Sequence, residues 1–102
     1  MNNNIKEAYI YLDDIRKEPN GYIRTKSVNE TISLIESLEK NNIEIKLIDL
    51  DHDLGDYSKD GGDAIKLLDF LVERNTLYPV KLHTMNVVGK DNMLKMINRY
   101  WK

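Results

Sequence analysis

The stretch "IEIKLIDLDHDLGD", residues 43–56, decides the fold class of this chain. Residues 43–50 form a nearly continuous apolar run of the length that a buried strand needs. Carboxylates follow at once, at Asp51 and Asp53, with His52 between them. A buried strand that ends in acidic residues is typical of an α/β sheet with a polar site at the ends of its strands.

Three other runs predict strands by the same criteria. Residues 8–12 and 80–84 are short and mostly apolar, whereas residues 22–26 alternate apolar and polar side chains as a half-exposed edge strand does. Helical patterns separate these runs, and the first of them opens with a capping box at Ser27 and Glu30. The sequence therefore predicts an α/β fold with a mainly parallel sheet of three or four strands. The helical patterns cover residues 27–41, 60–75 and 90–102.

Composition narrows the class of protein. The 102 residues suffice for one domain, 1–102, with a single core. The 15 basic and 17 acidic residues form no basic stripe, which argues against binding to duplex nucleic acid. The chain has no cysteine, so a metal would bind through oxygen and imidazole. No apolar run has the length of a signal peptide or a membrane span, and we expect a cytoplasmic protein of a bacterial cell with no membrane partner.

The polar residues that follow the strands are expected to meet. Connections between parallel strands are right-handed, so successive strands end at the same edge of the sheet. Open α/β sheets bind their ligands at that edge. The groups that this rule brings together are Asp13 with Asp14, Asp51 with His52 and Asp53, and His83 with Thr84.

Three motifs give the chain a family resemblance: "YLDDIR" (11–16), "LDHDLG" (50–55) and "HTMNVVGKDNM" (83–93). Together they resemble the cyclic-phosphate-processing receiver-like family, a derivative of response-regulator receiver domains. The resemblance implies a flavodoxin-like fold and a link to the cyclic phosphates of nucleotides or RNA.

The same resemblance implies roles for single residues. Asp13 and Asp14 match the acidic metal-binding pair of a receiver, Asp51 matches its phosphoacceptor and Thr84 its hydroxyl residue. The chain departs from a receiver in two places. The loop of residues 15–21 replaces the first helix, and the chain stops after its third helix, without the last strand, its lysine and the last helix. The expected fold is therefore a truncated receiver, derived from a three-layer architecture.

The two missing helices would cover the same face of a receiver sheet. Their loss predicts an uncovered apolar face, and such faces are association sites. We therefore expect a homodimer that pairs sheet against sheet. The alternative is that the loop of residues 15–21 and Trp101 fold over this face. The residues expected on the face are Tyr9, Tyr11, Leu47 and Leu82.

The acidic residues predict a divalent-metal site, with Mg²⁺ or Mn²⁺ as the expected ion. These cations prefer carboxylate oxygens, and Mg²⁺ keeps waters and positions for a substrate phosphate. Two alternatives stay open: turn aspartates that face solvent, or a metal-free site whose carboxylates accept bonds from amides, cations or ribose hydroxyls. Asp49 is expected to be a buried acceptor and Asp56 a turn residue. The candidate metal ligands are Asp13, Asp14, Asp51 and Asp53.

Asp51, His52 and His83 are the candidate catalytic residues. A histidine acts as a general base when neutral and as a general acid when charged. His52 lies between two aspartates, which favour its charged form. For His83 the alternative of a core histidine with satisfied hydrogen bonds stays open, because its strand otherwise reads as core.

Other residues are candidates for holding the ligand. Arg16 can contact a phosphate bidentately or simply offset the acidic charge. Residues 86–93 read as a helix-entry loop, in which Gly89 lets the backbone approach an anion and the amides near Asp91 and Asn92 face it. Ordinary capping of the helix by Asp91 or Asn92 is the alternative. The ligand-binding candidates are Arg16, Thr84, Asn86, Gly89, Lys90 and Asn92.

Three functions are compatible with these residues. The first is a metal-dependent phosphodiesterase that recognises and hydrolyses a cyclic phosphate or cyclic nucleotide. The second is a non-catalytic binding protein, for instance a phage-encoded sponge that captures a cyclic-nucleotide signal and so counters host defence. The third, a receiver phosphorylated at Asp51, is disfavoured by the missing lysine. We predict recognition of a cyclic phosphate, with hydrolysis favoured over capture.

Overall fold

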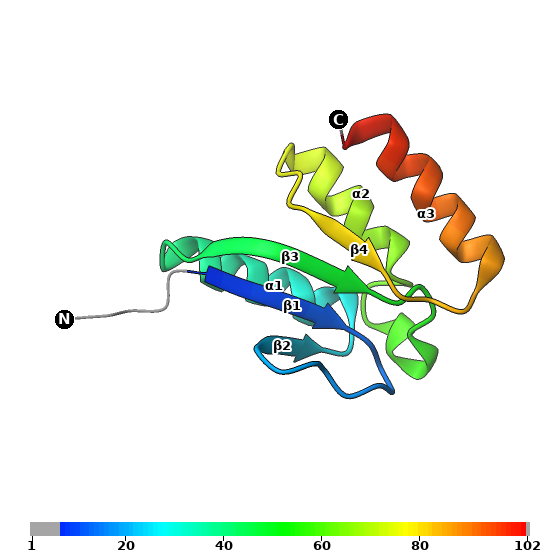
Figure 1. Cartoon of the computed structure of the whole chain (residues 1–102), viewed down its shortest axis with the longest axis horizontal. Coiled ribbons are helices and arrows are strands. Elements are labelled where there is room, and N and C mark those ends of the chain that lie inside the picture. Colours follow the sequence, from blue (N-terminus) through cyan, green and yellow to red (C-terminus); the bar gives the residue numbers. More distant parts are fainter. Residues whose placement is uncertain (1–6, 102) are drawn as a thin grey trace.

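The computed structural model describes residues 7–101 of the 102-residue chain. These residues form one sheet, three α-helices and one short 3₁₀ helix (Figure 1). No described helix is long and apolar enough to cross a membrane. In chain order the elements are β1 (Glu7–Leu12), β2 (Tyr22–Thr25), α1 (Val28–Lys40), β3 (Glu44–Leu50), η1 (Gly55–Lys59), α2 (Ile65–Arg74), β4 (Val80–Leu82) and α3 (Val87–Tyr100).

The strands lie in the order β2–β1–β3–β4, and every pairing is parallel. In register, Ile10 of β1 lies between Ile23 of β2 and Ile48 of β3. All strands therefore end at the same edge of the sheet, as the arrows in Figure 1 show. The predicted receiver-like α/β fold with a parallel sheet is confirmed.

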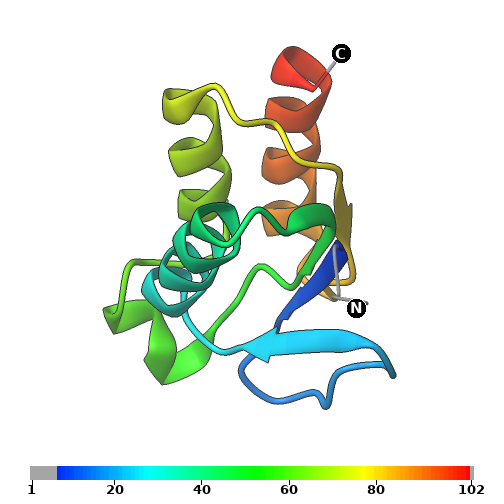
Figure 2. The ribbon, with the colours of Figure 1, turned by 90° about the vertical axis from the view of Figure 1, so that its left-hand side faces the viewer.

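All three α-helices pack on one face of the sheet, and Figure 2 shows them on the same side of the strands. The strands present alternate residues to this face, where Ile10, Ile48 and Leu50 are fully buried. Leu68 of α2 and Met93 of α3 are equally buried against them. A single core between the sheet and its helices holds the strand ends in place.

Helix α1 begins where the capping box predicts. Ser27 is the N-cap, and its Oγ accepts a hydrogen bond from the backbone N–H of Glu30 at 3.0 Å. The carboxylate of Glu30 accepts from the backbone N–H of Lys26 at 2.8 Å, so only the Ser27 half of the predicted box has its usual partner. The buried side of the helix carries Val28, Thr31, Ile35 and Leu38.

The other two helices begin at different residues from those predicted. Helix α2 begins at Ile65 rather than at residue 60, because Gly61 and Gly62 have φ angles of +108° and +91°, which a right-handed helix excludes. Helix α3 begins at Val87 rather than at residue 90, because the side chain of Asn86 caps it.

The earlier start of α3 removes the predicted anion site. The backbone N–H of Lys90 donates to the carbonyl of Asn86 at 2.8 Å, so the amides of Asp91 and Asn92 lie inside the helix, beyond its first turn. The expectation that these two amides face an anion was wrong. The alternative that Asp91 or Asn92 caps the helix was wrong for the same reason.

The opposite face of the sheet is not covered by any of the described helices. The segment of residues 13–21 joins β1 directly to β2, in place of a helix, and α3 is the last element described. Tyr9 and Leu47 lie on this face, as predicted, but they are half-buried rather than fully exposed. Trp101 packs against the core on the helix side, so the alternative in which it folds over the uncovered face was wrong.

Two residues predicted to be exposed on this face are not. Tyr11 is only 7% exposed, and its ring stacks on the ring of His83 at a centroid distance of 4.4 Å. Leu82 pairs with Leu50 in the sheet and therefore points to the helix side, where it packs against the core. The uncovered face is thus less apolar than predicted.

Candidate functional site

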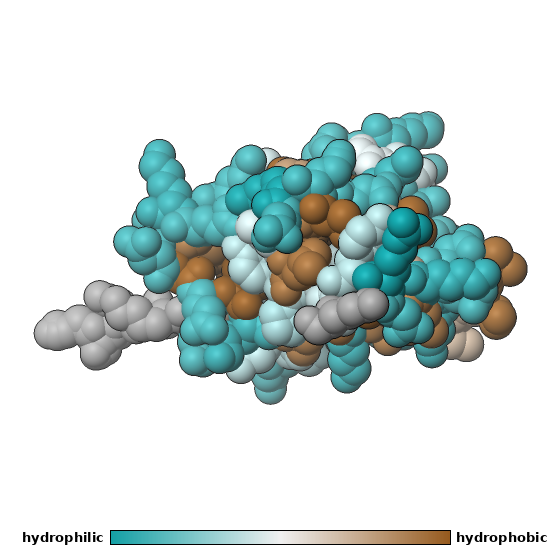
Figure 3. Space-filling model, turned by 90° about the horizontal axis from the view of Figure 1, so that it is seen from above, coloured by the Kyte–Doolittle hydropathy of each residue, from teal (hydrophilic) through white to brown (hydrophobic). Residues whose placement is uncertain are grey.

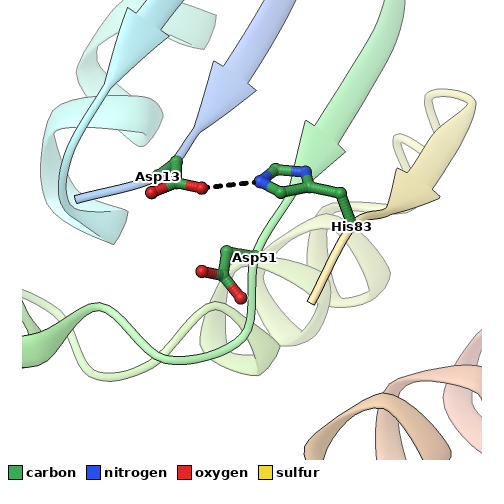
Figure 4. Close-up of side chains that lie close together, drawn as sticks. All are labelled: Asp13, Asp51 and His83. Atoms are coloured by element: carbon green, nitrogen blue, oxygen red, sulfur yellow. Dashed lines mark hydrogen bonds and ion pairs between the residues drawn. The ribbon is translucent and has the colours of Figure 1, made fainter. Parts of the chain in front are cut away.

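Side chains from three different strand ends meet at the edge where the sheet ends. Asp13 follows β1, Asp51 follows β3 and His83 follows β4, and Figure 4 shows them converging. One carboxylate oxygen or ring nitrogen of each lies within 4.8 Å of the others. The parallel topology thus brings together the residues that the sequence predicted would meet.

Asp13 is held rigidly, because it is 1% exposed and both of its oxygens are bonded. Its Oδ1 accepts hydrogen bonds from the backbone N–H groups of Ile15 and Arg16, each at 2.8 Å, and its Oδ2 lies 2.9 Å from Nε2 of His83. Burial by itself raises the pKa of this carboxyl, but the two N–H donors and the imidazole outweigh it and lower the pKa. Asp13 is therefore a fixed negative charge.

His83 lies between two carboxylates. Its Nδ1 is 2.6 Å from Oδ1 of Asp49, which is itself buried, and its Nε2 bonds to Asp13. The ring also lies flat on Tyr11, with an interplanar angle of 4°. The ring of His83 thus bridges the two carboxyl groups through its two nitrogens. We call Asp13, Asp49, Tyr11 and His83 the His83 cluster.

The carboxylates of Asp14 and Asp51 have fewer hydrogen-bond partners than that of Asp13. Among residues 7–101 no side chain donates a hydrogen bond to either of them, and Asp51 accepts only the backbone N–H of His52, at 2.7 Å. Burial raises the pKa of Asp14, and the negative charges of Asp13 and Asp51 raise it further. Gly55 lies so close to Asp14 that a Cβ there would come within 2.7 Å of Oδ2. Negative charge is therefore concentrated at this point of the edge.

His52 belongs to a second group of polar side chains. Its Nδ1 lies 2.8 Å from Oδ1 of Asp53, and the side-chain amide of Asn86 donates to both oxygens of Asp53, at 3.0 and 2.9 Å. The hydrogen bond with His52 lowers the pKa of Asp53, and Asn86 lowers it further against the opposing effect of burial. No described residue bonds to Nε2 of His52, so one ring nitrogen is oriented and not otherwise engaged.

Gly89 completes this second group through its lack of a side chain. Its backbone N–H donates to Oδ1 of Asn86 at 2.8 Å, and a Cβ at this position would lie 2.5 Å from the ring of His52. Gly89 thus allows α3 to approach His52, whereas the sequence suggested that it allows approach of an anion. We call His52, Asp53, Asn86 and Gly89 the His52 cluster.

The remaining predicted residues lie around these clusters. Arg16 donates from Nη1 to the carbonyl of His83 at 3.4 Å and so ties the β1–β2 connection to the end of β4. Thr84 Oγ1 accepts from the backbone N–H of Asn86 at 3.1 Å. Lys90 and Asn92 are exposed on α3, and no hydrogen bond joins the Asn92 side chain to another described residue.

Two residues of the site, Asp63 and Tyr11, were not predicted from the sequence. The carboxylate of Asp63 accepts from the backbone N–H of Leu54 at 3.2 Å and lies close to His52 and Asp53. Tyr11 supports the ring of His83. The sequence did contain a signal for Tyr11. It lies two residues before Asp13, and alternate residues of a strand share a face. Asp63, nine residues beyond Leu54, gives no comparable signal.

Comparison with protein families agrees with this geometry. A sequence model of the cyclic-phosphate processing receiver domain matches residues 8–99. The chain belongs to this family. The match covers the described strands except Glu7, the first residue of β1, and nearly all of α3, so it includes both the His83 cluster and the His52 cluster. Comparison with curated proteins and with solved structures gives no match.

Proposed function

We propose that the acidic edge of the sheet binds a cyclic phosphate, with a cyclic nucleotide as the expected ligand, and hydrolyses it. The observation that carries this proposal is the convergence of Asp13, Asp51 and His83 from three strand ends, with Asp14 beside them. Burial raises the pKa of Asp14, and the charges of Asp13 and Asp51 raise it further, which shows that positive charge close to Asp14 does not balance them. A divalent cation bound together with a phosphate would supply that positive charge.

The donor set fits Mg²⁺ or Mn²⁺. Asp51 and Asp14 are the carboxylates to which no described side chain donates, and Asp13 and His83 lie within reach of Asp51. Asp53, also predicted as a ligand, lies instead with His52 and Asp63. A cation held by Asp14 and Asp51, next to Asp13, would offset the acidic charge and polarise the phosphoryl oxygens when bound.

The chain's own residues account for proton transfer and orientation. His52 is 15% exposed at its side chain and oriented by Asp53, so its Nε2 is the better placed of the candidate acid–base nitrogens. Arg16 lies at the mouth of the site, where its guanidinium can contact phosphate oxygens. Thr84 and Asn86 border the same edge and offer polar groups for orientation.

A second function, capture of the ligand without hydrolysis, is favoured by one observation. Both ring nitrogens of His83 are hydrogen-bonded to carboxyl groups, so a ligand or a metal can reach either nitrogen only by breaking one of these bonds. A site with a single available histidine suits a binding protein that sequesters a cyclic nucleotide, for instance one that counters host defence.

One experiment separates the two functions. The purified protein is incubated with cyclic mono-, di- and trinucleotides and 2′,3′-cyclic phosphates, in Mg²⁺, Mn²⁺ or EDTA, and the small molecules are chromatographed before and after heat denaturation. A new product that EDTA prevents supports hydrolysis. A ligand that disappears and returns intact after denaturation supports capture. If no member of the panel is altered or retained, the proposal is wrong.

We also propose that two chains pair through the uncovered face of the sheet. Tyr9, Tyr22 and Leu47 lie on this face, and the two tyrosine rings pack together at 5.5 Å. Light scattering at micromolar concentration tests the pairing: we expect a dimer that Leu47→Glu dissociates. A monomer in the unsubstituted protein would rule it out.

A further inference from the structure

A hollow of about 480 Å³ adjoins the proposed phosphate site. It lies between the segment that follows β4 and the outward side of α3, and Figure 3 shows apolar side chains at the end of the molecule where α3 begins. Its volume is within the range of small-molecule sites. It is lined by Thr84, Met85, Val87, Lys90, Asp91 and Leu94.

The walls of the hollow are apolar and exposed to water. Met85 is 83% exposed, Val87 80% and Leu94 39%. Val87, Lys90 and Leu94 recur at helical spacing, and so form one side of α3, beside the side on which Met93 is buried. Apolar groups that gather in this way commonly mark a binding site.

The two charged side chains of the hollow differ in whether they are paired. Asp91 is paired with Lys95 at 3.2 Å, whereas none of the described carboxylates lies within ion-pair distance of Lys90. Lys90 therefore leaves a positive charge at the rim. Thr84 adds a hydroxyl on the side nearest the site.

The lining of the hollow lies next to the acidic edge in the chain. Thr84 directly follows His83, and Asn86, the N-cap of α3, donates to Asp53. A ligand whose phosphate lies at the strand ends would therefore place its remaining part against Met85 and Val87.

We infer that this hollow takes the nucleobase of a cyclic nucleotide whose phosphate lies at the acidic edge. The inference rests on the proposed function and narrows its ligand from any cyclic phosphate to a nucleoside cyclic phosphate. A base has apolar faces and a polar rim. Met85, Val87 and Leu94 match the faces, and Thr84 and Lys90 match the rim.

The test compares two probes by calorimetric titration. One is 2′,3′-cyclic AMP, and the other is glycerol 1,2-cyclic phosphate, which has the cyclic phosphate but no base. The double variant Val87→Ser, Leu94→Ser removes apolar contact without a change of charge. Leu77→Ser is the matched control, because Leu77 is 36% exposed and lies outside the hollow.

We expect the unsubstituted protein to bind the nucleotide more tightly than the glycerol probe. The double variant should bind the nucleotide about tenfold more weakly, which is the effect of losing one buried apolar side chain. Its affinity for glycerol cyclic phosphate should be unchanged. The control should bind both as before. Equal affinities of the unsubstituted protein for the two probes, or equal losses of both in the double variant, would overturn the inference and leave the phosphate site intact.

A third probe separates this inference from the proposed function. Adenosine has the base but no phosphate, and its contact with the hollow should shift the NMR signal of the Met85 methyl group. If neither cyclic phosphate binds but adenosine causes this shift, the phosphate site is wrong and the base site stands. If cyclic AMP binds and leaves the Met85 signal unchanged, the base lies elsewhere and the inference fails.

Discussion

The His83 cluster and the His52 cluster lie at the same edge of one sheet, yet they use a histidine in opposite ways. His83 is fixed between two buried carboxylates, and both of its ring nitrogens are bonded. Among residues 7–101, His52 has a hydrogen-bond partner at ring nitrogen Nδ1 but none at Nε2, and its ring lies against a glycine of α3. The same residue type thus holds strand ends together in one cluster and presents a nitrogen in the other. Hydrogen-bond partners, rather than residue type, distinguish the two roles.

The largest expected difference between the clusters is in stability. His83→Ala leaves the buried carboxyl groups of Asp13 and Asp49 without the imidazole that both of them contact, and we expect a loss of about 3–5 kcal/mol in the free energy of unfolding. His52→Ala, the matched control, breaks one bond at the surface and should cost about 1 kcal/mol. Urea denaturation of both variants measures the difference. Equal losses would show that the two histidines are not distinguished in this way.

Gly89→Ala tests the packing of the His52 cluster. The new Cβ would lie 2.5 Å from the His52 ring, so we expect a loss of about 1–3 kcal/mol, although alanine favours a helix. In the His52→Ala background the same substitution should be neutral or stabilising, because the ring is gone. A double-mutant cycle measures this coupling. Absence of coupling would mean that the effect of Gly89→Ala does not come from its contact with the His52 ring.

Asp13→Asn and Asp14→Asn should change stability in opposite directions. Asp13 accepts two backbone bonds and faces His83, so its neutralisation should cost about 1–3 kcal/mol. Asp14 is repelled by its neighbours, so its neutralisation should stabilise the fold by about 1 kcal/mol or less. Thermal unfolding of the two variants decides this, and a loss from both would contradict the contrast.

The smallest predicted effect concerns pH. The difference in stability between Asp14→Asn and the unsubstituted protein should depend on it. The pKa of Asp14 is higher in the folded chain than its ordinary value of 3.8, so the ionised carboxyl lowers stability at neutral pH. This penalty disappears as the pH falls below 3.8, where Asp14 is protonated in both the folded and the unfolded chain. The stability of Asp14→Asn relative to the unsubstituted protein should therefore shrink between neutral pH and about pH 3.5. A constant difference across this range would indicate that the burial of the ionised Asp14 carboxyl and its repulsion by Asp13 and Asp51 are not the cause.

The sequence predicts the strands and the meeting of polar residues at one edge because both depend on local pattern. The apolar runs before Asp13, Asp51 and His83 define strands, and parallel topology then requires their ends to coincide. The boundaries of α2 and α3 depend instead on caps and on glycine φ angles. Such features are decided by single contacts, such as that between Asn86 and Gly89.

The division of the site into two clusters was not predictable from pattern. Asp49 and Asp13 reach opposite sides of the His83 ring only through the register between β1, β3 and β4. The approach of Gly89 to His52 depends on how α3 packs. Sequence spacing therefore identifies which polar residues gather, whereas packing decides which of them stay free to act.

The most direct test of the central claim follows a cyclic phosphate by ³¹P NMR, with Mg²⁺ and the protein present. We predict that the cyclic phosphodiester signal of 2′,3′-cyclic AMP is replaced by a monoester signal, and that Asp51→Asn abolishes this conversion while the protein stays folded. Equal conversion by Asp51→Asn would contradict the assignment of the acidic edge. A cyclic signal that neither converts nor broadens, for any cyclic phosphate tested, would contradict the proposed function itself.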